Sequence, residues 1–336
     1  MDLSTTSPHS RPMIIADLTL NRLNEARRRI EGMVHRTPLL HSQTLSARIG
    51  APVWLKCENL QKTGAFKVRG ALNRLLTLSD EERARGVSTV SAGNHAQAVA
   101  WAATSADVSS TVVMMEHASP TKVRASREYG AEVILHGDAS AAFHKVQEVS
   151  DERGLTFVHP FDDADVVAGH ASCGLEILED LPETGTIVVP VGGGGLSSSI
   201  AAAAALSGTE VDVWGVEPTG APAMHASFSA GQAVQIDQVN TVADGLGPPM
   251  AGAINYEILS QHARGIVLVE DSEIVSAMMV LLERTKLLAE PSGAAGLAAL
   301  LQGKIEIDQE RPVVIVISGG NADLDQLARL VQGEAC

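Results

Sequence analysis

Aromatic residues, cysteines and positive charge are all scarce in this sequence of 336 residues. Phe, Trp and Tyr make up 3% of the chain, and 25 Lys and Arg stand against 40 Asp and Glu, a formal net charge of −15. An acidic surface disfavours binding to phosphate backbones and anionic membranes, and few aromatic rings remain for stacking on nucleobases. We therefore expect neither a nucleic-acid nor a membrane partner, although a local basic pocket can still hold an anion.

The cysteines Cys57, Cys173 and Cys336 are too few and too widely spaced for a zinc motif or a disulfide framework. They are more typical of buried or incidental thiols than of nucleophiles, and unpaired thiols favour a reducing compartment, which predicts a cytoplasmic protein. The chain has no apolar run of the about 18 residues that a membrane helix needs. The polar segment 1–12 lacks the apolar centre of a signal peptide, and we interpret it as a short mobile tail.

Short apolar runs alternate with helical patterns through most of the chain. We predict strands at 53–58, 87–91, 111–115, 132–135, 156–158, 186–190, 211–216, 266–269 and 312–317. We predict helices at 18–33, 95–105, 119–129, 139–152, 197–206 and 272–289, with a last helix after 321. Alternation of this kind predicts parallel sheets covered by helices on both faces. Two such runs predict two α/β domains with a ligand cleft between them.

The segment 62–71, KTGAFKVRGA, places Lys67 in the first turn of a predicted helix. The apolar residues that follow have the spacing of one buried helical face: Val68, Ala71, Leu72, Leu75 and Leu76. A helix start carries unpaired N–H groups and partial positive charge, which disfavour the cationic form of an amine held there. These conditions suit a nucleophilic amine that forms a Schiff base, whereas the alternative is a solvated surface lysine.

Four consecutive glycines, Gly192 to Gly195, separate a predicted buried strand from a predicted helix. Without Cβ atoms, their N–H groups can close around an anion, and the helix start adds positive potential. This pattern favours a phosphate cup, although it lacks the Lys-Ser/Thr pair of a P-loop. A dinucleotide loop stays open, because Glu217 lies near the required distance, and a simple tight turn is the third interpretation.

Two further strand-to-helix turns carry polar residues, SAGNH at 91–95 and SGGN at 318–321. In parallel sheets such turns meet where ligands bind. Together the turns provide an amine, a phosphate cup, a carboxylate cup and a hydroxyl. Pyridoxal 5′-phosphate requires this set, because it has an aldehyde, a phosphate, a phenolic oxygen and a ring nitrogen.

Segments 56–71, 91–97, 191–196 and 317–321 resemble, in this order, the serine/threonine dehydratase family of fold-type II pyridoxal-phosphate enzymes. The resemblance runs from about residue 20 to 335. It implies two α/β domains with parallel sheets flanked by helices and the active site in the interdomain cleft. Residues 62–160 would form the small domain, and residues 1–61 and 161–336 the large, cofactor-binding domain.

The implied activity is β-elimination from a β-hydroxy amino acid, L-threonine or L-serine by default, giving a 2-oxo acid and ammonia. A homodimer is usual for the family. The length leaves no room for the regulatory domain of longer dehydratases, so feedback control through such a domain is not expected.

The resemblance also implies roles for single residues. Lys67 would hold the cofactor as a Schiff base and later remove the α-proton, with Phe66 against the pyridine ring. Asn94 would bond the phenolic oxygen, and Ser318 would face the ring nitrogen. The phosphate would lie on Gly192, Gly193, Gly194, Gly195 and Leu196. The substrate carboxylate would lie on Ser91, Gly93, Asn94 and His95.

Three departures from the family pattern are informative. Ala65 replaces a common serine beside the lysine, and Ala92 replaces the serine with which serine racemases protonate the opposite face, so racemization is not favoured. The segment 168–174, AGHASCG, replaces the usual AGQGT pattern. His170 is then either a structural histidine or a reader of the substrate side chain. The second reading would suit a dicarboxylic or longer substrate such as 3-hydroxyaspartate.

Glu217-Pro218 matches the start of a cation site in some relatives, but Ala223 stands where those relatives have an aspartate. We therefore predict no metal. Two other function classes stay open, a dinucleotide-binding oxidoreductase based on the glycine run and a non-catalytic amino-acid or cofactor carrier.

Overall fold

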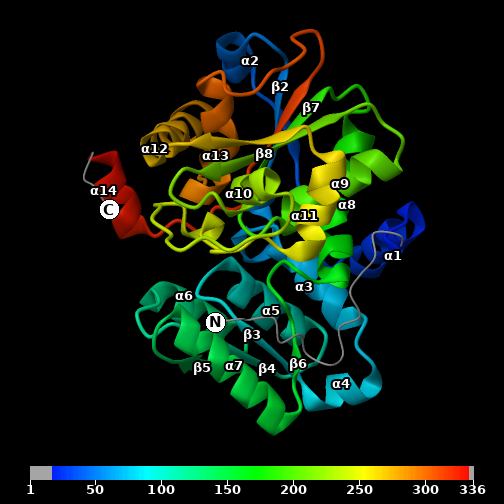
Figure 1. The fold of residues 1–336 in the computed structure, drawn as a ribbon, viewed down its shortest axis with the longest axis vertical. Helices are drawn as coiled ribbons and strands as arrows, with labels where there is room; N and C mark the ends of the chain where they lie inside the picture. The colour runs from blue at the N-terminus through cyan, green and yellow to red at the C-terminus, as the bar shows by residue number, and fades with distance from the viewer. Residues whose placement is uncertain (1–16, 333–336) are drawn as a thin grey trace.

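The computed structural model describes residues 17–332, which form two β-sheets. Figure 1 shows the larger sheet in the upper part of the molecule and the smaller sheet in the lower part. The predicted N-terminal tail and Cys336 lie outside the described residues. The smaller sheet takes all its strands from between residues 87 and 157, within the segment 62–160 predicted as the small domain. That division of domains stays a prediction.

The larger sheet has six strands in the order β1-β2-β10-β7-β8-β9. The strands are β1 (Leu39–His41), β2 (Val53–Lys56), β7 (Thr186–Pro190), β8 (Asp212–Pro218), β9 (Gly265–Val269) and β10 (Val313–Val316). All neighbours pair in parallel except β1, which is antiparallel to β2. The predicted parallel α/β fold is confirmed, with this edge strand as the exception. Pro38 keeps the chain extended before β1, so the strand adds to the sheet edge.

Helices cover both faces of the larger sheet. One face packs against α12 (Asp271–Val280) and α13 (Pro291–Leu301), and the other against α8 (Ala164–Asp180) and α9 (Gly195–Leu206). With both faces covered, the inner strands are largely apolar, and the central strand β10, with the sequence VVIV, is so throughout.

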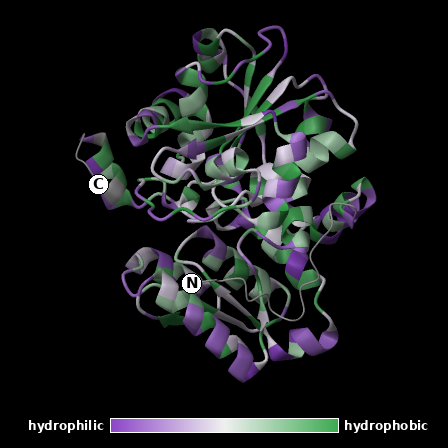
Figure 2. Ribbon diagram, in the orientation of Figure 1, coloured by the Kyte–Doolittle hydropathy of each residue, from purple (hydrophilic) through white to green (hydrophobic). Residues whose placement is uncertain are grey.

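The smaller sheet has four parallel strands in the order β5-β4-β3-β6. They are β3 (Val87–Val90), β4 (Ser110–Met114), β5 (Glu132–Leu135) and β6 (Thr156–Phe157). Helices α5 (Asn94–Ser105) and α6 (Pro120–Glu128) pack on one face, and α7 (Ala139–Arg153) packs on the other. Figure 2 shows hydrophilic residues along α7, as expected for an outer helix with one buried stripe.

The remaining helices connect or flank the sheets. They are α1 (Leu20–Ile30), α2 (Gln43–Ile49), α3 (Lys67–Leu76), α4 (Asp80–Arg85), α10 (Ala223–Ala230), α11 (Ala253–His262) and α14 (Leu324–Val331). The short helices are η2 (Glu58–Leu60), η3 (Lys62–Gly64), η4 (Asp244–Leu246) and the π-helical segment η5 (Leu281–Thr285). In the part of the chain that the structure describes, no helix combines the length and apolar character needed to cross a membrane.

The helix predictions need correction. The predicted helix 272–289 ends at Val280, and a π-helical turn follows before Lys286 takes a left-handed conformation with φ 62°. Helices α2, α4, α10, α11 and α13 are absent from the sequence-based prediction, and so is the long helix α8. Its residues from Val166 to Leu178 are buried on every side, so no amphipathic period marks it in the sequence.

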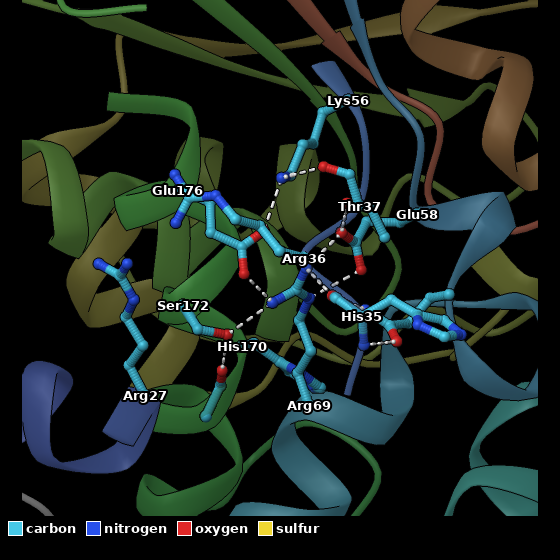
Figure 3. Close-up of polar contacts among 12 residues, drawn as sticks. Arg27, His35, Arg36, Thr37, Lys56, Glu58, Arg69, His170, Ser172 and Glu176 are labelled. Atoms are coloured by element: carbon cyan, nitrogen blue, oxygen red, sulfur yellow. Dashed lines mark hydrogen bonds and ion pairs between the residues drawn. The ribbon is translucent and has the colours of Figure 1, made fainter. Parts of the chain in front are cut away.

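A buried ion network joins α3, α8 and the edge of the larger sheet. Arg69 of α3 is fully buried and donates to Glu58 of η2 at 2.8 Å and to Glu176 of α8 at 2.7 Å. Glu176 also accepts from Lys56 of β2 at 2.6 Å, and Ser172 accepts from Arg69 at 3.1 Å. Figure 3 shows the Arg69 guanidinium between the two carboxylates, with Lys56 on the far side of Glu176.

The network is balanced, with two cations and two carboxylates away from water. Burial alone would raise the pKa of Glu58, but the facing Arg69 guanidinium outweighs it and holds the pKa below the usual value. Removal of one member leaves an uncompensated buried charge, which is far more costly than loss of an exposed pair.

We predict that Arg69→Met lowers the free energy of unfolding by about 3–5 kcal/mol, because Glu58 and Glu176 lose their main partner. Urea denaturation measures this change. The matched control is Arg27→Met, which breaks the exposed pair with Glu179 and should cost about 0–1 kcal/mol. Equal losses in the two variants would contradict the importance of the buried network.

Candidate active site

A cavity of about 360 Å³ lies at the carboxyl ends of strands from both sheets. Ser91 follows β3, Gly192 follows β7 and Ser318 follows β10, so the chain reaches the cavity from three turns. The predicted site residues that line it are Phe66, Lys67, Ser91, Gly93, Asn94, His95, Gly192, Gly193, Gly194, Gly195, Leu196 and Ser318. His170 is the one predicted site residue that does not.

Lys67 is the first residue of α3 and lines the cavity as a half-buried side chain. Its Nζ donates to the carbonyl oxygen of Pro160 at 2.7 Å and lies 5.1 Å from the centroid of the Phe66 ring. Burial lowers the pKa of the Lys67 amine to about 8, because the surroundings solvate its charge poorly. A substantial part of this amine is therefore neutral near physiological pH, the form that attacks an aldehyde.

The backbone before Lys67 is held against the SGGN turn. The Phe66 N–H donates to the carbonyl oxygen of Ser318 at 3.1 Å, and Ala65 forms an isolated antiparallel bridge with Gly319. A Cβ at Gly319 would lie 2.3 Å from the Glu290 carboxylate and 3.2 Å from the Ala65 Cβ, so glycine is needed at this approach. The lysine and the Ser318 hydroxyl are thus held on adjoining segments of backbone.

The glycine run forms a loop of free donors. Within residues 17–332, none of the N–H groups from Gly192 to Leu196 donates a hydrogen bond. Gly194 has φ 94° and is the N-cap of α9, a left-handed conformation that favours glycine. Asn255 of α11 fixes the loop from behind by donating to the carbonyl oxygens of Gly193 and Phe161. Free N–H groups at a helix start form an anion site.

The turn 91–95 forms a second set of donors on the opposite side of the cavity. The N–H groups of Ala92, Asn94 and His95 have no acceptor among the described residues, whereas Gly93 donates to the Ser91 hydroxyl at 3.2 Å. His95 is buried, and its Nε2 lies 3.2 Å from the carbonyl oxygen of Val158. Burial and the nearby Lys67 hold the pKa of His95 well below its usual value, so the ring is neutral.

Asn94 is held by two residues from the larger sheet's side of the cavity. Its Nδ2 donates to Glu290 at 2.6 Å, and its Oδ1 accepts from Asn321 at 2.8 Å. Asn321 donates also to the carbonyl oxygen of Thr63, next to the lysine segment. The Asn94 side chain therefore has one orientation, fixed by partners just before α13 and just after β10.

Three charged residues of the cavity have no signal in the sequence. Glu290 is buried beside Asn94, and burial raises the pKa of its carboxyl to about 7, with the Asp244 charge adding to the shift. Lys122 of α6 pairs with Asp244 of η4, so an ion pair connects the two sides of the cavity. Single charged residues in helices and loops do not stand out in a sequence, and only the fold brings these three together.

His170 lies behind Phe66 instead of in the cavity. It is fully buried on α8, and its ring centroid is 4.7 Å from that of Phe66. Its Nδ1 accepts the N–H of Gly70 at 3.0 Å. The predicted substrate contact from His170 is therefore not supported by the geometry, because the Phe66 ring lies on its side toward the cavity.

The donor set fits pyridoxal 5′-phosphate. The glycine loop presents unpaired N–H groups for a phosphate, Lys67 supplies the amine, and Ser318 supplies a neutral hydroxyl. The cation site of some relatives fits poorly here, because both Glu217 oxygens accept N–H groups of Met224 and His225 at the start of α10. Ala223 offers no ligand, and the absence of a metal stays a prediction.

We predict that Lys67 in the cofactor-free protein titrates with a pKa near 8, far below the ordinary lysine value of 10.5, because it is buried. The pH dependence of trinitrobenzenesulfonate labelling measures it as a fast-reacting amine that Lys67→Ala removes, in addition to the N-terminal α-amine, which titrates in the same range. The neighbouring variant Lys62→Ala is the matched control and should keep both fast amines. An unchanged number of fast amines in Lys67→Ala, or a midpoint near 10.5, would be incompatible with the environment described here.

Known proteins are similar to this chain in sequence and in fold. The pyridoxal-phosphate dependent enzyme family model matches residues 30–319. The L-threonine ammonia-lyase of Thermotoga maritima is 43% identical over 94% of this chain and 78% of its own length. The solved threonine deaminase from T.th. is 39% identical, with a TM-score of 0.85 over 91% of this chain and 99% of that one.

The serine racemase of Dictyostelium discoideum is also similar, at 37% identity and a TM-score of 0.86 over 91% of this chain and 99% of that one. The resemblance drawn from the four motifs is confirmed by these matches. The family match excludes the dinucleotide interpretation of the glycine run, because it covers that run together with the lysine segment and the first two residues of the SGGN turn. The chain belongs to the pyridoxal-phosphate dependent enzymes of fold-type II.

Proposed function

We propose that the protein is a pyridoxal-phosphate dependent ammonia-lyase that converts L-threonine or L-serine into a 2-oxo acid and ammonia. The observation that carries this proposal is the placement of the low-pKa amine of Lys67 between two sets of unpaired N–H donors in one cavity. One set suits a phosphate, and the other suits the carboxylate of an amino acid. The similar protein of Thermotoga maritima is an L-threonine ammonia-lyase.

The bound cofactor withdraws electrons from the α-carbon of the amino acid attached to it. The chain's own residues hold it in place, with the loop 192–196 at the phosphate, Asn94 at the phenolic oxygen and Ser318 at the ring nitrogen. A neutral serine hydroxyl cannot keep that nitrogen protonated as a carboxylate would. With such a neutral partner the cofactor would supply weaker electron withdrawal at the α-carbon, which suits a reaction that eliminates a β-substituent.

Lys67 then acts as the base. With the cofactor bound, its amine would be the group placed to accept the α-proton, because the lowered pKa leaves part of it neutral. The N–H groups of Ala92, Asn94 and His95 hold the substrate carboxylate, which fixes the α-carbon relative to the lysine. His95 stays neutral and contributes orientation instead of charge.

The charges of the cavity favour threonine and serine over a dicarboxylic substrate such as 3-hydroxyaspartate. Among the described residues that line the cavity, the cations are Lys67 and Lys122, and Lys122 is already paired with Asp244. Asp244 and Glu290 add negative potential. A second substrate carboxylate would thus lack a cationic partner, and burying an unpaired charge is costly.

Racemization is a weaker alternative. The likeness to the Dictyostelium serine racemase motivates it, but Ala92 carries no side-chain proton donor for the face opposite Lys67.

Formation of a homodimer in the cytoplasm is a further proposal. Two buried thiols without a disulfide, Cys57 and Cys173, agree with a reducing compartment.

We predict release of a 2-oxo acid from L-threonine and L-serine by the pure protein loaded with pyridoxal phosphate. The two 3-hydroxyaspartate diastereomers should react at least about tenfold more slowly in kcat/KM, because their second carboxylate is unpaired. A coupled 2-oxo-acid assay measures these rates. Chiral chromatography of recovered serine should detect no D-serine.

Lys67→Ala is the control for the chemistry and should lose the activity. Lys122→Ala is the control for the charge argument. Loss of the Lys122 amine should not raise kcat/KM for the two 3-hydroxyaspartate diastereomers. Equal or faster turnover of 3-hydroxyaspartate would contradict the substrate assignment. No turnover of any β-hydroxy amino acid would contradict the proposed reaction.

A further inference from the structure

Helix α3, which carries Lys67, starts without a capping side chain of its own. Phe66 occupies the N-cap position and makes no side-chain cap, although the first N–H groups of a helix need partners. The Arg69 N–H reaches back to the carbonyl oxygen of Phe66 at 3.0 Å. Among the described residues, the N–H groups of Lys67 and Val68 have no acceptor, and the N–H of Gly70, one turn after the N-cap, is satisfied from outside the helix.

His170 satisfies it from α8. Its Nδ1 accepts the Gly70 N–H at 3.0 Å in a fully buried position. An accepting Nδ1 carries no proton, so the neutral ring carries its proton on Nε2. Burial, together with the charge of Lys67, holds the pKa of His170 well below its usual value, so the neutral ring persists at physiological pH.

The space between α3 and α8 is shaped for this ring. A Cβ at Gly70 would lie 2.4 Å from Cε1 of His170, and a Cβ at Gly169 would lie 2.4 Å from the carbonyl oxygen of Arg69. Two glycines therefore allow the imidazole to reach the α3 backbone. Figure 3 shows His170 on the same helix as Ser172 and Glu176, which hold the Arg69 side chain.

The other side of the imidazole contacts Phe66. The two rings meet edge to face at 63°, with centroids 4.7 Å apart. Nε2 of His170 has no hydrogen-bond partner among the described residues. Phe66 lines the cavity and His170 does not, so any effect of His170 on bound molecules passes through Phe66 or through the start of α3.

We propose that His170 is a positioning residue that fixes both Phe66 and the start of the Lys67 helix for the cofactor. It does so with two separate parts of one side chain, Nδ1 at the Gly70 N–H and the ring against Phe66. The inference rests on the proposed function, because it assumes that the cofactor lies against Phe66 and is bonded to Lys67. It assigns His170 no contact with the substrate.

Two substitutions separate these parts. His170→Gln keeps an acceptor for Gly70 but removes the ring, and His170→Phe keeps a ring but removes the acceptor. Cys173→Ala is the matched control, because Cys173 is also fully buried on α8 and belongs to the core cluster against which Phe66 packs, but it lacks the imidazole contacts to Gly70 and Phe66. Each protein is loaded with pyridoxal phosphate and compared by visible circular dichroism, cofactor dissociation constant and steady-state kinetics.

We expect His170→Gln to reduce the circular dichroism of the bound cofactor and to lower kcat by about 2- to 10-fold, because the amide, like the glutamine of the usual AGQGT pattern, keeps the acceptor for Gly70 but leaves Phe66 without its ring contact. KM for L-threonine should change by less than about threefold, because His170 does not contact the substrate. His170→Phe should weaken cofactor binding and lower the thermal midpoint, because the Gly70 N–H is left buried and unpaired. Cys173→Ala should keep the wild-type dichroism and kcat.

Wild-type dichroism and kcat in both His170 variants would overturn the proposal and leave His170 a filler of the core. A rise in KM for one substrate with unchanged kcat would also overturn it, because His170 would then read the substrate. Losses in Cys173→Ala equal to those in His170→Gln would assign the effect to general loosening of α8. If the wild-type protein itself binds no pyridoxal phosphate, the proposed function is wrong. If the wild-type protein binds it and the His170 variants behave as the wild type, only the positioning role of His170 is wrong.

Discussion

The buried ion network around Arg69 is the constraint on which the site depends. Arg69 lies two residues after Lys67 on the same helix, and its guanidinium is held by Glu58 and Glu176 from two other segments. These contacts fix the rotation of α3 about its axis, and with it the direction in which Lys67 points. A charged cluster this deeply buried favours one arrangement strongly, because any other leaves a charge without its partner. His170 adds a hydrogen bond to the backbone of the same helix turn.

The cavity itself uses few formal charges. The loops 192–196 and 91–95 offer unpaired backbone N–H donors for the phosphate and the carboxylate that we propose to bind there, and the hydroxyl of Ser318 is neutral. The lining cations are an amine with a lowered pKa, Lys67, and a lysine already paired, Lys122. Dipoles that are fixed by the fold stabilise bound anions without the mobility of long charged side chains. Lys67 is therefore not needed to neutralise the charge of a bound anion and can act in the reaction itself.

The sequence is sufficient to predict the parts of the molecule that repeat a local pattern. The strands of both sheets other than β1, the position of Lys67 at a helix start and the three glycine-containing turns can all be predicted, because apolar periods and glycine runs are local signals. Helix α8 escapes prediction because it is buried on every side, polar residues included, and the edge strand β1 runs antiparallel for reasons of sheet topology. Lys122, Asp244 and Glu290 come from different elements, so their meeting in the cavity depends on tertiary packing. His170 stands out in the sequence, but only the packing of α8 on α3 shows that it faces Gly70 and Phe66.

The central claim is that Lys67, and no other amine, bonds the cofactor. Borohydride reduction of the loaded protein, followed by proteolysis and mass mapping, tests it directly, because reduction makes the bond permanent. The account predicts a single phosphopyridoxyl adduct on the peptide that contains Lys67. An adduct on Lys62 or Lys122, or no adduct despite bound cofactor, would contradict it.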